Sequence, residues 1–262
     1  MFSSLIPFPL SAVFGYFYVS GLNLAHKESL KQTILPAVCQ FFDGIEHMSE
    51  PGDSFERQRF QDCHVIRSGE WVTFEDLFVG RYRDTGFKMV EALVLTRLEG
   101  LKMFDGLLFE IGVPMEFSGH ILIINDGWMR RVFKGYAGWL RQVFQGYTVP
   151  DEPRVNVDNA AFEARFAVYA SDVEEAKRLV SPKFCNNMLA LADSYSEKTL
   201  GAAFVDGVFL LAIPVKGDLF ESGSIKQSVF DCENDIRELM REITTAHRVI
   251  DYFHGERSDK PD

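Results

Sequence analysis

The chain has 262 residues, a length typical of one large domain or two small ones. Hydrophobic residues make up 47% and charged residues 25%, which excludes a wholly disordered or collagen-like chain, and 24 phenylalanines can fill a large core. The formal net charge of −11 makes this an acidic protein and argues against a broad surface for nucleic-acid phosphates.

Residues 1–26 form an apolar segment that contains no Asp, Glu, Lys or Arg. Its most apolar part, Leu10–Val19, is shorter than the about 20 residues that a spanning helix needs. The charged start and the cleavage site of a signal peptide are not clear either. Three interpretations stay open: an element of the core, a segment that contacts or enters a membrane, and the remainder of a longer membrane-anchored start.

Helical periodicity follows over Ser29–Ile45, where apolar residues recur at spacings of three and four. The predicted apolar face of this helix comprises Leu30, Ile34, Val38, Phe41 and Ile45. Over about Phe60–Leu98 the period changes to two and predicts a hairpin that turns at Tyr82–Gly86. Two more strands are expected at Gly106–Ile111 and Gly119–Ile124.

Two prolines in Val149–Pro153 mark an internal boundary, where two halves of one domain over residues 27–254 are expected to meet. A strand is predicted over Phe162–Tyr169. It is followed by a helix whose start is predicted to be a capping box formed by Ser171 and Glu174.

The C-terminal part starts with a helix capped at Ser181-Pro182 and continues with a hairpin that turns at Asp206-Gly207. A long amphipathic helix over Phe230–Phe253 carries Glu242 off its apolar stripe, and residues 255–262 form a polar tail. Strands and helices are grouped rather than alternating. The sequence therefore predicts an α+β fold with a mostly antiparallel sheet or sheets, flanking helices and a long C-terminal amphipathic helix.

Common catalytic motifs are absent: the sequence has no glycine-rich nucleotide loop, zinc-protease helix or serine nucleophile elbow. The four cysteines form no Cys-x-x-Cys pair and are expected to be reduced thiols. Cys63 and His64 are neighbours on a predicted strand, so their side chains should face opposite ways and not share a metal. His247 lies in the stripe of the last helix and is expected to be a core histidine. We therefore expect no catalytic residue, no metal and no cofactor.

A pair of carboxylates is the one candidate binding site. Asp76 lies between Phe74 and Phe78 on one predicted strand face, and Glu91 lies on the facing strand of the hairpin. Antiparallel pairing would bring both carboxylates together on an apolar face, where their repulsion requires a shared proton, a cation or a metal. The alternative is a partly exposed face, or neutralisation by a nearby arginine such as Arg57 or Arg59.

The stretch Trp128–Tyr147 mixes aromatic and basic side chains. Its cations are Arg130, Arg131, Lys134 and Arg141. They could contact anionic lipid or a protein partner, or form the solvent side of an amphipathic element whose rings face the core. Stacking on nucleic acid is the least favoured interpretation, given the net charge.

A block near the middle of the chain carries a family likeness. The run Phe162–Leu179 reads FEARFAVYASDVEEAKRL, and Ser181-Pro182-Lys183-Phe184 follows it. It resembles the bacterial domain-of-unknown-function family 3137, whose hallmark is FExxFxVYxxD, an E-A pair and a T/S-P step. Shorter matches, such as Asp218-Leu219-Phe220-Glu221, extend the likeness over about residues 31–253. The resemblance implies a bacterial protein, commonly with membrane-spanning segments ahead of the domain, and it implies no activity.

These observations predict a non-catalytic protein-interaction module at or near the cytoplasmic face of a membrane. A protein partner, a second copy of the chain and a membrane surface are the expected contacts, whereas the sequence names no small molecule. The alternative is an enzyme, or a domain that binds a small ligand or ion through Asp76 and Glu91.

Overall fold

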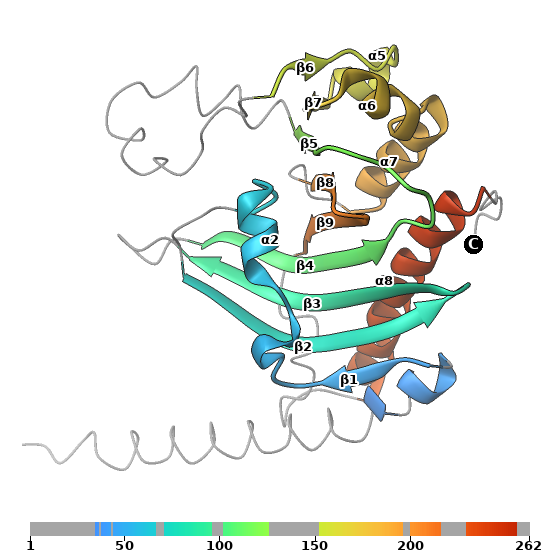
Figure 1. Cartoon of the computed structure of the whole chain (residues 1–262). Coiled ribbons are helices and arrows are strands. Elements are labelled where there is room, and N and C mark those ends of the chain that lie inside the picture. The colour runs from blue at the N-terminus through green and yellow to red at the C-terminus, as the bar shows by residue number, and fades with distance from the viewer. Residues whose placement is uncertain are drawn as a thin grey trace, which may run out of the picture.

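The computed structural model describes residues 35–36, 38–42, 44–66, 71–95, 102–125, 152–195, 200–215 and 229–255 (Figure 1). The apolar segment 1–26 and the basic stretch with Arg130, Arg131, Lys134 and Arg141 lie outside the described residues. None of the described helices is long and apolar enough to cross a membrane.

One antiparallel sheet of nine strands runs through the described residues, in the order β1-β2-β3-β4-β9-β8-β5-β7-β6. The strands are β1 (Glu46–Met48), β2 (Trp71–Tyr82), β3 (Thr85–Leu95), β4 (Lys102–Gly112), β5 (Ile121–Asn125), β6 (Arg154–Val155), β7 (Phe166–Ala170), β8 (Gly201–Val205) and β9 (Val208–Pro214). Strands from the two sides of residues 149–153 pair with each other, because β9 lies against β4 and β5 lies between β7 and β8. The predicted α+β class with antiparallel pairing is confirmed.

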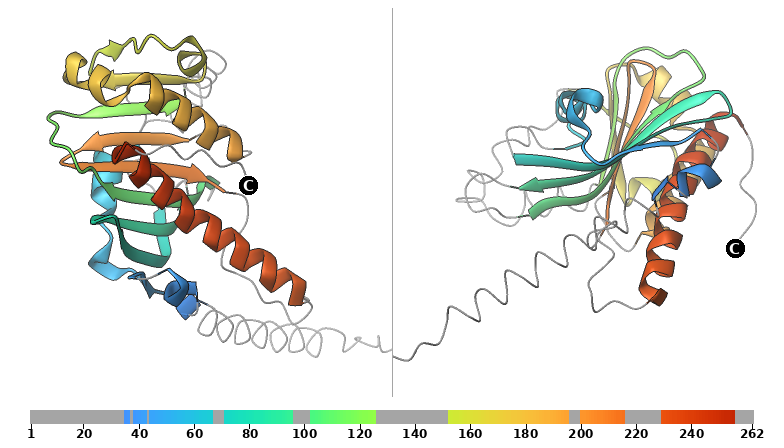
Figure 2. Two further views of the ribbon diagram at one scale, coloured as in Figure 1. Left: turned by 90° about the vertical axis from the view of Figure 1, so that its right-hand side faces the viewer. Right: turned by 90° about the horizontal axis from the view of Figure 1, so that it is seen from below.

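Helices cover the two faces of the sheet unequally (Figure 2). They are α2 (Arg57–Asp62), α5 (Ala160–Glu163), α6 (Val173–Leu179), α7 (Pro182–Ser194) and α8 (Val229–Phe253), with a short 3-10 helix, η1 (Gly52–Ser54). The face beneath α6, α7 and α8 buries the larger core, which includes Phe109, Phe204 and Phe209. The opposite face packs against α2 and buries Phe60 and Leu108.

The two tight turns predicted from sequence are confirmed. Asp206 and Gly207 join β8 to β9 with φ angles of 48° and 78°, and Arg83 and Asp84 join β2 to β3 with φ angles of 48° and 62°. Positive φ at both central residues gives a turn whose twist matches that of the paired strands.

The expected N-terminal helix ends earlier than predicted. Residues 35–36 and 38–41 are helical, and the chain then turns at Gly44, whose φ is +80°, into β1. Val38 and Ile45 are buried as predicted, but Phe41 is 72% exposed. The helix ends before Ile45. Ile45 is therefore buried outside the helical stripe that was expected to include Phe41.

Two predicted strands begin too early. Phe60 lies in α2 rather than in a strand, and His64 follows it in a left-handed conformation with φ of 55°. Phe162 lies in α5, which is capped by the Asn159 side chain accepting from the Phe162 backbone N–H. Both phenylalanines are fully buried, and a buried aromatic residue satisfies a helical and a strand pattern equally well.

The start of α6 is shifted by one residue. Asp172, not Ser171, is the N-cap, and its carboxylate accepts from the backbone N–H groups of Glu174 and Glu175. The Ser171 hydroxyl instead accepts from the backbone N–H of His120 at 2.9 Å. The cap predicted at Ser181, with Pro182 at the first helical position, is confirmed.

The long C-terminal helix α8 is confirmed, with Leu239, Ile243 and Ile250 buried. His247 is half-buried and stacks on Tyr82 with ring centroids 4.1 Å apart, and burial lowers its pKa. The expectation for Glu242 is wrong, because this residue is fully buried.

Candidate functional site

A β-bulge in β2 determines where the predicted carboxylates lie. The hairpin turn pairs Tyr82 with Thr85, and an uninterrupted ladder from there would place Asp76 opposite Glu91. The register shifts between Glu75 and Phe78, so Glu75 is the residue opposite Glu91. One extra residue in β2 therefore removes the direct opposition expected for Asp76 and Glu91.

The bulge also separates the two phenylalanines that were expected to share a face. Phe78 belongs to the core under α8, whereas Phe74 packs on the α2 side. Arg59, considered as a neutralising cation, instead pairs with Glu110 at 3.1 Å and with Glu56 at 2.9 Å.

Asp76 itself is held in a constrained and buried position. Its φ is 49°, a left-handed conformation that is uncommon for a residue other than glycine, and only 1% of its surface is exposed. Its backbone N–H donates to the Ser49 carbonyl, and its Oδ1 lies 2.8 Å from Nε2 of His47. Bulges and left-handed residues of this kind gather at functional sites, which makes the pair a candidate site.

His47 comes from β1, the strand at the edge of the sheet. It lies opposite Phe78 in the ladder, and the two rings are 4.8 Å apart. The imidazole thus packs against the Phe78 ring, and its Nε2 contacts the Asp76 carboxylate. Its side chain keeps 13% of its surface exposed, so one part of the ring still reaches the outside.

A cavity of about 620 Å³ opens at this place, and we call it the β1 cavity. The described residues that line it are Pro36, Cys39, Gln40, Gly44, Ile45, Glu46 and His47. They come from the helical residues before β1, from the turn that follows them and from β1 itself, at the lower end of the sheet in Figure 1. The cavity therefore combines an apolar wall, a thiol and an imidazole that a buried carboxylate orients.

The chemistry of the β1 cavity favours binding over nucleophilic catalysis. Burial raises the pKa of the Cys39 thiol, which keeps the sulfur protonated, whereas a nucleophilic cysteine needs the thiolate. Among the described residues no group of three or more His, Cys, Asp or Glu side chains could hold a metal ion. An imidazole oriented by a carboxylate can still accept or donate one hydrogen bond to a bound group.

Sequence reasoning singled out Asp76 but missed its partner. His47 lies in a strand of three residues, which is too short for a periodic signal. No sequence pattern between His47 and Asp76 predicts that residues 29 positions apart are in contact. Phe41 was missed as a surface residue because helical spacing placed it in the core.

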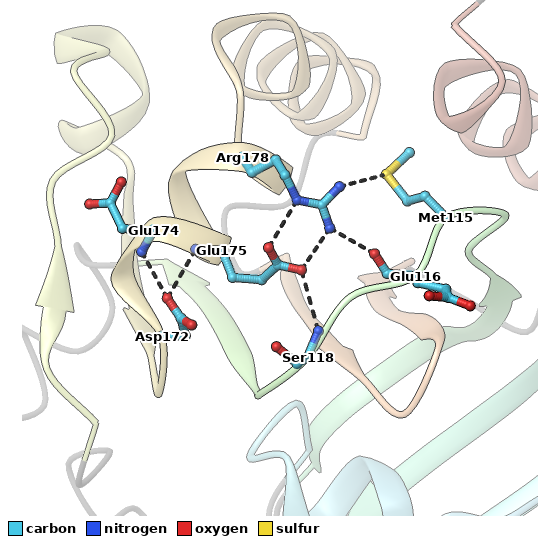
Figure 3. A network of polar contacts seen from close by, with 7 residues as sticks. All are labelled: Met115, Glu116, Ser118, Asp172, Glu174, Glu175 and Arg178. Carbon is cyan, nitrogen blue, oxygen red and sulfur yellow. Dashed lines mark hydrogen bonds and ion pairs between the residues drawn. The ribbon is translucent and has the colours of Figure 1, made fainter.

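The family-like block has a structural explanation, and Figure 3 draws the part of it that concerns Glu175 and Arg178. Phe162 and Phe166 are buried with rings 4.9 Å apart, and Glu163 accepts the backbone N–H of Val157 at 2.9 Å. Glu175 on α6 accepts from Arg178 and from the backbone N–H of Ser118. The Glu175 contact with Ser118 joins α6 to the loop between β4 and β5, whereas the Glu163 contact joins α5 to the residues just before it.

Comparisons with known proteins identify the family of this chain. The profile of the family described as "Protein of unknown function (DUF3137)" matches residues 102–254, more than half of the chain. A search of curated proteins finds no match. Among solved structures, mycobacterial trehalose monomycolate transport factor A, TtfA, is similar at 11% identity and a TM-score of 0.37, over 82% of this chain and 90% of that one. By its family profile, the chain belongs to the DUF3137 family.

Proposed function

We propose that this protein is a non-catalytic interaction module that binds a protein partner at the β1 end of its sheet, at or near the cytoplasmic face of a membrane. The observation that carries the proposal is Phe41, which is 72% exposed and follows in the chain directly after Gln40, a lining residue of the β1 cavity. Large exposed aromatic side chains are enriched among the anchor residues of protein interfaces.

Packing beneath Phe41 supports this role. Its ring meets Phe42 edge-on at 5.3 Å, and Phe42 in turn contacts His247 of α8 at 5.7 Å. A preorganised anchor loses little conformational entropy when it binds. The membrane part of the proposal comes from the sequence, because the uncharged residues 1–26 end shortly before the helical residues that carry Phe41.

The first test compares Phe41→Ser with Trp71→Ser. Trp71 is 70% exposed but lies at the start of β2, away from β1, so it is a matched control for losing one exposed ring. We expect a partner protein that binds the purified full chain in calorimetry to lose at least about tenfold in affinity with Phe41→Ser, the usual cost of removing an anchor. The Trp71→Ser variant should bind like the wild type. Equal losses in both variants, or saturable turnover of a metabolite by the pure protein, would contradict the proposal.

The membrane component has a separate readout. The full chain should cosediment with vesicles that contain anionic lipid, and a chain that starts at residue 27 should not. Equal sedimentation of the two proteins would remove residues 1–26 from the membrane contact and leave the partner site untouched.

A second candidate function is a small-ligand or ion site, or an enzyme, that uses Asp76 and Glu91. The observation that favours it is the orientation of His47 at the β1 cavity by the buried Asp76 carboxylate. The paired changes Asp76→Asn and Glu91→Gln should then abolish binding or turnover. Unchanged binding and unchanged stability in that double variant would eliminate this candidate.

A further inference from the structure

We infer that the first part of β2, Trp71–Glu75, pairs along its outer side with the same residues of a second copy of this chain, so that two sheets join across a two-fold axis. We call these residues the β2 edge. The inference uses neither Phe41 nor the β1 cavity, and it goes beyond the proposed partner site. It draws on three features of the β2 edge: its lack of protection, the direction of its backbone groups and the side chains that self-pairing brings together.

The outer side of β2 is only partly covered. β1 pairs with Leu77–Val79, and among the described residues no strand pairs with the β2 edge on that side (Figure 1). An uncovered edge is a template for another strand, and proteins usually protect it with lysine, proline or a very short strand. The β2 edge reads WVTFE, without lysine or proline, and three of its five residues are exposed. It is therefore open to pairing with another chain.

The opposite end of the sheet favours a closed dimer. The last strand there, β6, has only two residues and carries Arg154, so it is a protected edge. Pairing of a β2 edge with β6 of another copy would repeat without end and form a filament, whereas antiparallel pairing of two β2 edges closes after two copies. The occupant that fits the β2 edge is thus a second β2 edge.

The backbone direction follows from one hydrogen bond. The Asp76 N–H donates to the Ser49 carbonyl, so it points to the outer side of β2. The Glu75 carbonyl belongs to the same peptide plane and points the opposite way, towards β3. In an extended strand the backbone groups of successive residues point to alternate sides. Val72 and Phe74 therefore direct their N–H and C=O groups outward.

One register satisfies all of these outward groups. With the two-fold axis at Thr73, Val72 of each copy lies opposite Phe74 of the other, and the two residues exchange both backbone hydrogen bonds. An axis at Phe74 would pair Val72 with Asp76, whose N–H already has an acceptor. An axis at Val72 would place Phe74 opposite Glu70, which lies outside β2. The backbone alone thus selects the axis at Thr73.

The same register brings complementary side chains together. Val72 and Phe74, each half-buried in one copy, form apolar pairs. Thr73 lies opposite itself, and threonine pairs hydrogen-bond across strands. Trp71 lies opposite Glu75, where the indole N–H can donate to the carboxylate, so no two like charges are opposed.

The first test is sedimentation equilibrium of the full 262-residue chain. Between about 1 µM and about 300 µM, where weak complexes dissociate, the wild type should show a monomer–dimer equilibrium. Val72→Pro removes an outward N–H and leaves the ladder to β3 intact, so it should weaken dimerisation by about tenfold or more. Val72→Ala shortens the same side chain but keeps the N–H, and it is the matched control. All three proteins retain residues 1–26, so association through that segment would affect them equally.

Two results of this test would overturn the inference. One is a wild type that stays monomeric over the whole range. The other is a Val72→Pro protein that is folded by circular dichroism and dimerises as tightly as the Val72→Ala protein.

A second experiment tests the register and does not need the proline variant to fold. Thr73→Cys places two thiols across the axis, in a pair without backbone hydrogen bonds where the strands are closest, so mild oxidation should produce a disulfide-linked dimer. Glu75→Cys is the matched control, because it is exposed on the same strand face but lies opposite Trp71. The wild type gives the background from the native cysteines.

No cross-linking of Thr73→Cys above that background, or equally fast cross-linking of Glu75→Cys, would show that the register is wrong and overturn the inference. None of these variants changes β1 or Phe41. Failure here therefore leaves the proposed partner site standing, and failure of the partner site leaves the dimer standing.

Discussion

Glu242 was expected on the solvent side of the last helix, but its side chain is buried. It lies on α8, is fully buried, and accepts hydrogen bonds from the Tyr195 hydroxyl and from Arg241, whose Nη2 is 2.8 Å from Oε1. The Tyr195 oxygen also contacts Thr245 at 3.0 Å, and the Arg241 guanidinium lies over the Tyr195 ring at 5.4 Å. The carboxylate is buried because Tyr195, which follows α7, lies against the polar side of α8 and supplies its partner.

We predict that Tyr195→Phe lowers the free energy of unfolding by about 1–3 kcal/mol, because the buried Glu242 carboxylate loses a hydrogen-bond donor. Tyr252→Phe is the control, since that hydroxyl lies 3.1 Å from Ser181 at a partly exposed position and should cost less. Urea unfolding followed by circular dichroism measures both variants. Equal unfolding midpoints for the two would show that the buried contact with Glu242 contributes nothing special.

At the scale of elements, helix α6 is capped by Asp172 and not by the Ser171 that the sequence pattern predicted. We predict that Asp172→Ala lowers the free energy of unfolding by about 1 kcal/mol, because the N–H groups of Glu174 and Glu175 lose their acceptor. Asp172→Asn keeps an acceptor oxygen at the same position and should retain most of that stability. Urea unfolding of the wild type and the two Asp172 variants measures these differences. A loss with Asn as large as with Ala would mean that the charge, and not the cap, stabilises α6.

Elements could be predicted from this sequence where the signal is local. Three predictions of this kind are confirmed: the hairpin turn at Asp206 and Gly207, the cap at Ser181 and the helix α8. Each depends on residues that are close together in the sequence. The bulge at Asp76 is a different case, because alternating residues continue on both sides of it and only the neighbouring strands show the extra residue. The candidate site depends on that bulge and on contact with His47, so its geometry could not be derived from the hairpin pattern.

The described part of the chain forms one sheet with a core on each side. The β1 cavity lies at the β1 end of the strand order, and the family-like block lies at the β7 and β6 end. The family profile covers β4 to α8, whereas Phe41, the β1 cavity and Asp76 all precede residue 102. Membership of DUF3137 therefore says nothing about the proposed partner site. Buried free thiols lie in both cores: Cys63 on the α2 side, and Cys185 together with Cys39 on the α8 side; Cys63 and Cys185 are the two with the larger rise in pKa.

These two thiols link the stability of both cores to alkaline pH. Burial is the main cause that raises the pKa of Cys63 to about 12 and of Cys185 to about 11. An unfolded chain releases thiol protons from about pH 8.5, while the folded protein keeps them up to the raised values. The unfolded state then binds fewer protons, so the free energy of unfolding should be unaffected by these groups near pH 7 and should fall as the pH rises above about 8.5.

The measurement is urea unfolding between about pH 7 and pH 10 under reducing conditions, a range that ends near the ordinary pKa of tyrosine. The double variant Cys63→Ala, Cys185→Ala should be less stable at neutral pH, because both sites lose packed atoms, but its stability should depend less on pH. A smaller alkaline slope remains in it, since burial also raises the pKa of the Cys39 thiol. A double variant that loses stability with pH as steeply as the wild type would show that the two buried thiols do not control alkaline unfolding.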